Sequence, residues 1–81
     1  MDNEIEKMIE QNFSESVVMR AKEILNTITT KNVTAHSKEN QRNTQIAVIK
    51  LASGSIEKLS HYVECAQKDF RDVIYWSTEN D

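Results

Sequence analysis

The chain of 81 residues contains no proline and a single glycine, Gly54. These two residues are the strongest interruptions of regular structure, so a chain with so few of them favours helices over many turns and short strands. The abundance of Glu, Lys, Gln, Ala, Ile and Leu points the same way. We therefore expect an all-α protein.

Cysteine is equally scarce, because Cys65 is the only one. A lone cysteine cannot form a disulfide within its chain, which excludes a small secreted domain held together by disulfides. The acidic N-terminal stretch lacks the positive region and apolar core of a secretory signal, and no apolar run approaches the ~18 residues of a membrane span. We expect one soluble domain over residues 1–81, located in the cytoplasm.

Neither sign of charge dominates, and the net charge is −3. Residues 1–15 carry five acids and one base, 16–54 six bases and two acids, and 55–81 six acids and three bases. Helices of opposite sign can attract within one fold or between two copies, whereas a nucleic-acid surface would show a concentrated basic excess. The sequence also lacks a glycine-rich phosphate loop and the common hydrolase motifs, which disfavours an enzyme.

Apolar residues recur at helical spacing in the first half of the chain. The spacing predicts a short helix over residues 3–11 and a second helix that begins at Asn12, where Glu15 stands three residues on and completes a capping box. Residues 29–36 show no apolar stripe and are predicted to be a loop. The second helix is expected to bury one stripe: Val17, Val18, Ala21, Ile24, Leu25 and Ile28.

Ser37 is predicted to cap a third helix that runs to about Ser53, with Gly54 as the left-handed residue that ends it. Residues 46–51 also favour a strand, because they include Ile46, Val48 and Ile49, and the strand stays an alternative here. After Gly54, Ser55 is predicted to cap the last helix, which has a heptad-like spacing and a possible break near Asp69. The prediction is a bundle of about four helices with a disordered tail over residues 77–81 and this core: Ile46, Ile49, Leu51, Leu59 and Val63.

His61 and Cys65 stand four residues apart and therefore share one face of the last helix. Such a pair can supply two zinc ligands, and Glu57 or His36 could add a third. The helical wheel, however, places His61 roughly opposite the apolar stripe and Cys65 about 130° from its centre, so that both residues lie on the solvated side. We therefore interpret this pair as part of an exposed polar helix face. We expect no metal, no cofactor and no catalytic residue.

Aromatic residues are few, and the last segment holds most of them. Tyr75 and Trp76 follow the final residue of the apolar stripe, so a single packed face cannot cover both. Either the fold shelters these rings or they contact a partner, and whether Trp76 belongs to the core or to an interface is left open. The residues predicted to bind a partner are Tyr62, Phe70, Tyr75 and Trp76, with Met8 and Met19 as possible extensions of the same patch.

The stretch LASGSIEKLSHYVECAQKDFRDVIYW resembles the C-terminal half of small uncharacterised bacterial helical proteins. In that family an apolar helix, a glycine turn, a second helix and an acidic and aromatic ending recur. The resemblance covers about a third of the chain and contains no chemical motif. It implies a helical fold and a bacterial cytoplasmic setting, and it implies no activity.

These patterns predict a small helical module that binds protein, either a second copy or another chain, without catalysis. The alternative is a nucleic-acid-binding protein that uses the basic segment over residues 31–50. Its candidate contacts to nucleic acid are Lys31, Lys38, Arg42 and Lys50.

Overall fold

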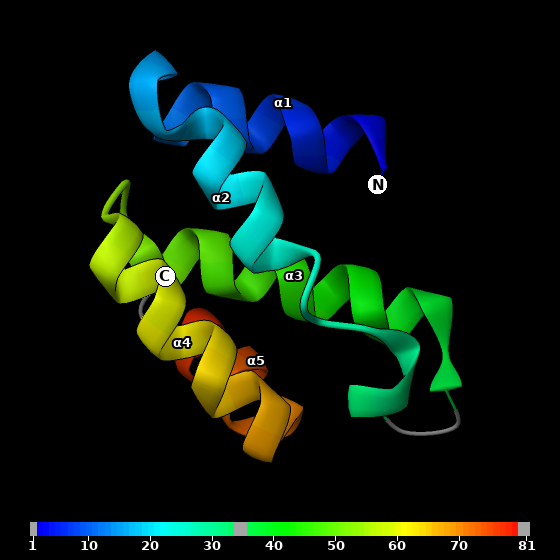
Figure 1. Cartoon of the computed structure of the whole chain (residues 1–81). Coiled ribbons are helices and arrows are strands. Elements are labelled where there is room, and N and C mark those ends of the chain that lie inside the picture. The colour runs from blue at the N-terminus through cyan, green and yellow to red at the C-terminus, as the bar shows by residue number, and fades with distance from the viewer. Residues whose placement is uncertain (1, 34–35, 80–81) are drawn as a thin grey trace.

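The computed structural model describes residues 2–33 and 36–79. Within these ranges the chain is all-helical, contains no strand and forms a compact assembly (Figure 1). The helices that lie wholly within the described residues are α1 (Asn3–Asn12), η1 (Glu15–Val17), α2 (Val18–Leu25), η2 (Thr30–Asn32), α3 (Lys38–Ala52), α4 (Ile56–Lys68) and α5 (Phe70–Glu79), where η marks a short 3₁₀ helix. The predicted fold class is confirmed, but the helix count is five rather than four.

Helix α3 is the central element. It packs against α1 on one side and against α4 and α5 on the other, while α2 bridges α1 and α4 (Figure 1). Because neighbours cover it from several directions, α3 buries side chains around much of its circumference: Thr44, Gln45, Ala47, Val48, Ile49 and Ala52. Residues 46–51 are therefore helical, and the strand alternative is wrong.

One apolar core joins all five helices. Of the predicted core residues, Ile49, Leu59 and Val63 are buried, whereas Ile46 and Leu51 are half-buried and pack against the edge of the cluster. None of the helices in the described part of the chain is both long enough and apolar enough to cross a membrane.

Two predicted helix starts are confirmed. The Ser37 side chain accepts a hydrogen bond from the Asn40 N–H, and the Ser55 side chain accepts one from the Lys58 N–H. Both satisfy an N–H that the first turn of a helix leaves without a partner. Helix α3, which starts after Ser37, ends at Ala52, close to the predicted end at Ser53.

The predicted cap at Asn12 is wrong. Asn12 is the last residue of α1, and its side-chain amide donates to the Met8 carbonyl at 2.7 Å. The reason lies in Phe13, which is buried and extended, with φ −118° and ψ 148°. This extended residue separates the two helices, so that the chain passes through η1 before α2 begins at Val18.

The predicted break near Asp69 is a full interruption. Helix α4 ends at Lys68, Asp69 is extended with φ −156°, and α5 begins at Phe70. The Asp69 carboxylate accepts a hydrogen bond from the Arg71 N–H at 3.1 Å, as expected of a residue that starts a new helix. Of the predicted tail, residues 77–79 belong to α5, and residues 80–81 lie outside the described residues.

Candidate functional site

His61 and Cys65 do come together on α4. The Sγ atom of Cys65 and the Nε2 atom of His61 lie 3.8 Å apart, with His61 exposed and Cys65 half-buried. Across residues 2–33 and 36–79, no group of three or more His, Cys, Asp or Glu side chains is arranged to hold a metal ion. Zinc sites normally supply three or four protein ligands, so this pair alone is half a site.

The rings of Tyr62 and Trp76 connect α4 to α5. Their centroids lie 6.3 Å apart in an edge-to-face arrangement, and the His61 ring contacts Tyr62 in the same way at 5.2 Å. Both Tyr62 and Trp76 are half-buried and pack against the core. Trp76 therefore belongs partly to the core, while part of its ring remains on the surface.

Tyr75 differs from the other predicted contact residues because it is 61% exposed. It lies on the outer face of α5, and its hydroxyl is 3.4 Å from Oε1 of Glu79. Phe70, at the start of α5, is half-buried. We call Tyr62, Tyr75 and Trp76 the α4–α5 aromatic surface.

Met19 was predicted to extend this aromatic patch, but it lies elsewhere. It is on α2, which packs against α1 and α4, whereas α5 packs against α3 and α4 (Figure 1). Met19 is 73% exposed, and Met8 instead packs against the core. A groove of about 510 Å³ lies beside Met19, and its lining residues are Glu10, Glu15, Val18 and Met19. The sequence did not predict this groove, because it forms only where α1 meets η1 and α2.

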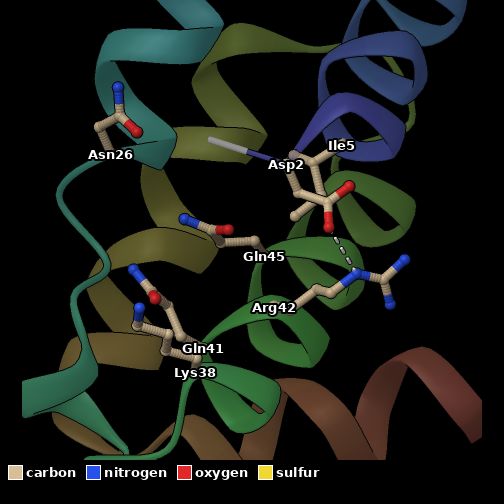
Figure 2. Close-up of a pocket in the computed structure, with 7 residues that line it drawn as sticks. All are labelled: Asp2, Ile5, Asn26, Lys38, Gln41, Arg42 and Gln45. Atoms are coloured by element: carbon tan, nitrogen blue, oxygen red, sulfur yellow. Dashed lines mark hydrogen bonds and ion pairs between the residues drawn. The ribbon is translucent and has the colours of Figure 1, made fainter.

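A polar cavity of about 310 Å³ lies between the start of α1, the end of α2 and the first half of α3 (Figure 2). The Gln45 Nε2 donates to the Leu25 carbonyl at 3.4 Å, and the Gln41 Nε2 donates to the Ile28 carbonyl at 3.0 Å. Both carbonyls lie where the chain leaves α2, and that of Leu25 also accepts a hydrogen bond from the Ile28 N–H at 3.1 Å. The two amides thus attach the exit of α2 to α3, which is a structural role.

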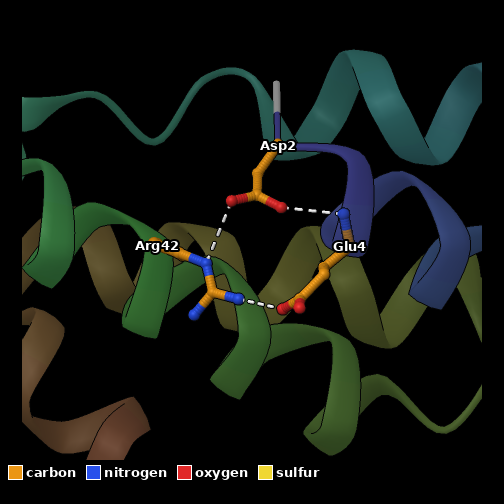
Figure 3. A network of polar contacts seen from close by, with 3 residues as sticks. All are labelled: Asp2, Glu4 and Arg42. Carbon is orange, nitrogen blue, oxygen red and sulfur yellow. Dashed lines mark hydrogen bonds and ion pairs between the residues drawn. The ribbon is translucent and has the colours of Figure 1, made fainter.

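Arg42 closes one side of this cavity through two ion pairs (Figure 3). Its Nε donates to Oδ2 of Asp2 at 3.1 Å, and its Nη2 donates to the Glu4 carboxylate. The pKa of the Asp2 carboxyl is lowered, first by the hydrogen bond from the Glu4 N–H and then by the one from Arg42. The network ties the N-terminal end of α1 to α3.

Three of the four cations predicted to contact nucleic acid, Lys38, Arg42 and Lys50, form no concentrated patch of positive charge on α3. Arg42 is neutralised by two carboxylates, and the exposed Lys38 and Lys50 stand twelve residues apart on α3, which separates them by roughly 18 Å along the helix axis. Nucleic-acid binding usually concentrates several cations on one face.

No family model matches the chain, and comparisons with curated proteins and with solved structures gave no match. The resemblance of residues 51–76 to a small bacterial family stays a prediction.

Proposed function

We propose that this protein is a non-catalytic protein-binding module that self-associates through the α4–α5 aromatic surface. The observation that carries the proposal is the 61% exposure of Tyr75 on α5, next in sequence to the half-buried Trp76. Tyrosine and tryptophan contribute large contact area at low entropic cost and often dominate the binding energy of an interface. Water covers most of Tyr75 in the isolated chain, and a partner would remove this ring from water.

A second copy of the chain is the partner that the surrounding charges support. Lys58 stands one turn before Tyr62 on α4, while Asp72 and Glu79 flank Tyr75 and Trp76 on α5, and all three charged residues are exposed. An interface with two-fold symmetry brings each patch against its own copy, so α4 of one chain can face α5 of the other. Opposite charges beside the rings would then pair across the symmetry axis.

The absence of catalysis is part of the proposal, and it is supported by the setting of His61 and Cys65. A catalytic thiol needs an activating base and a site that encloses the substrate. His61 supplies a base at 3.8 Å, but it is exposed on an open helix face. The grooves between α1 and α2 and between α2 and α4 are lined by other residues.

The test is the solution mass of the protein across a dilution series, with Tyr75→Ala as the variant. The wild type is expected to shift from monomer to dimer as concentration rises, and Tyr75→Ala to raise the dimer dissociation constant at least about tenfold, as interface hot spots do. Thr78→Ala is the matched control, because Thr78 is also exposed on α5. Circular dichroism should show unchanged helicity in both variants.

A wild type that remains monomeric up to millimolar concentration would refute self-association. So would equal dissociation constants for wild type and Tyr75→Ala. A variant at Trp76 is less informative, because Trp76 also packs against the core and its removal changes the fold as well as the surface.

A further inference from the structure

We infer that the groove beside Met19 is a second binding surface, and that it takes a basic segment of another protein with one or two large apolar side chains flanked by Lys or Arg. We call it the Met19 groove, defined by Glu10, Glu15, Val18 and Met19. The inference rests on the proposed protein-binding function, but it uses different residues, on α1, η1 and α2, and its test can fail independently.

The apolar part of the groove consists of Val18 and Met19. Met19 is 73% exposed, the larger of the two exposed fractions found among large apolar side chains in the described part of the chain. Methionine is flexible and polarisable, so it adapts to apolar partners of different shape. The groove of about 510 Å³ lies within the range of sites that accommodate one or two bulky groups.

The position of the groove follows from the turn between α1 and α2. Phe13 is only 4% exposed, and its burial forces the chain to turn sharply after α1. Glu10 on α1 and Glu15 at the start of η1 then line the same groove as Val18 and Met19. Met19 does not belong to the buried face of α2, because Ala21 and Leu25 supply that face.

The negative charge of Glu10 and Glu15 in the Met19 groove favours a positively charged partner. Glu10 and Glu15 are exposed, and neither forms an ion pair with any residue in ranges 2–33 and 36–79. The segment over residues 1–15 has five acids against one base. Two unpaired carboxylates beside an apolar floor attract cations next to an apolar side chain and repel acidic partners.

A second copy of this chain does not offer that combination. The exposed large apolar side chains of the described residues are Met19 and Tyr75. Tyr75 is flanked on α5 by Asp72 and Glu79 and by Arg71, whose charge is paired with Asp69, and Met19 belongs to the groove itself. The occupant is therefore a different protein, in contrast to the α4–α5 aromatic surface.

The experiment measures fluorescence anisotropy of labelled peptides at low and high salt. The probes are amphipathic peptides of lysine with leucine, phenylalanine or methionine, and a peptide in which glutamate replaces lysine. We expect at least one lysine peptide to bind, the glutamate peptide not to bind, and affinity to fall as salt rises. Backbone amide NMR shifts should change in α1, η1 and α2.

Two variants test the groove and one controls for net charge. Glu10→Gln with Glu15→Gln, and separately Met19→Ala, should each weaken binding at least about tenfold. Glu57→Gln with Glu64→Gln removes the same charge from exposed positions on α4 and should leave affinity within about twofold. Tyr75→Ala should also retain binding, so that loss of self-association and loss of peptide binding are separate results.

Failure of every lysine peptide to bind at low salt would overturn the inference. So would equal weakening by the α4 charge variant and by the groove variant, because binding would then depend only on total charge. All substituted side chains are exposed, and unchanged thermal unfolding of the variants confirms that the fold is intact.

Discussion

Gly54 links the end of α3 to the start of α4 and touches α1. Its φ is +84°, and a Cβ atom at this position would lie 2.6 Å from the Asn12 carbonyl oxygen. Ser53, immediately before it, is also left-handed with φ 49°, but its side chain is exposed. The two residues share an unusual backbone conformation, and only Gly54 lacks space for a side chain.

Gly54→Ala is therefore expected to destabilise the protein by more than about 1 kcal/mol, through backbone strain together with the clash against α1. Ser53→Gly is the control, since it relieves a left-handed serine without adding an atom, and it should cost no more than about 0.5 kcal/mol. Urea denaturation followed by circular dichroism measures both. Equal stability of the wild type and Gly54→Ala would contradict the close approach to Asn12.

At the scale of elements, helix starts depend on individual hydroxyl groups. Ser37 and Ser55 each cap a helix through the side chain, whereas Ser14, which precedes η1, makes no such bond. The three serines therefore provide a comparison within one chain. Helix α4 depends most on its cap, because it begins directly after the left-handed turn at residues 53–54.

Ser55→Ala should reduce the free energy of unfolding by about 1 kcal/mol, within the range measured for loss of a helix N-cap. Ser14→Ala is the matched control and should change it by less than about 0.5 kcal/mol, because its oxygen satisfies no helix N–H. Chemical denaturation of the three proteins gives the comparison. A larger loss for Ser14→Ala than for Ser55→Ala would show that the caps are wrongly assigned.

At the scale of the whole molecule, the Arg42 network joins the N-terminal end of α1 to α3, across forty residues of sequence. Asp2 lies on the surface, and its lowered pKa makes the contact sensitive to acid. A carboxyl whose pKa is lower in the folded state stabilises the fold above its ordinary pKa of about 3.9. That contribution begins to be lost as the pH falls below about 4, and the loss is complete once the pH is below the lowered pKa of Asp2 in the folded protein.

NMR titration of the aspartate side chains tests this link. In Arg42→Ala the pKa of Asp2 should rise partway towards its ordinary value, because the Glu4 N–H remains and is the larger cause of the shift. Asp69 is the internal control, since its pKa is lowered mainly by the side-chain hydrogen bond from Arg71 and should not respond. An unchanged Asp2 pKa in Arg42→Ala would show that α1 and α3 are not joined through this pair in solution.

The sequence by itself determined the features that depend on a few neighbouring residues. The scarcity of breakers gave an all-helical chain, the hydroxyls of Ser37 and Ser55 marked two helix starts, and the turn at Gly54 ended α3. Asp69 marked the break in the last helix, although its spacing alone did not show that α5 is a separate helix. These are local signals, because a cap or a left-handed turn acts within one turn of helix.

Only the tertiary structure decided which side chains are exposed and which are paired. Asn12 failed as a cap because the burial of Phe13 moved the start of α2. Residues 46–51 are part of helix α3, whose neighbours bury Ala47, Val48 and Ile49. Tyr75 and Trp76 are adjacent in sequence, yet one faces solvent and the other packs on Tyr62 and the core. Exposure depends on which elements come to lie beside a residue, and that arrangement is fixed by packing between segments distant in sequence.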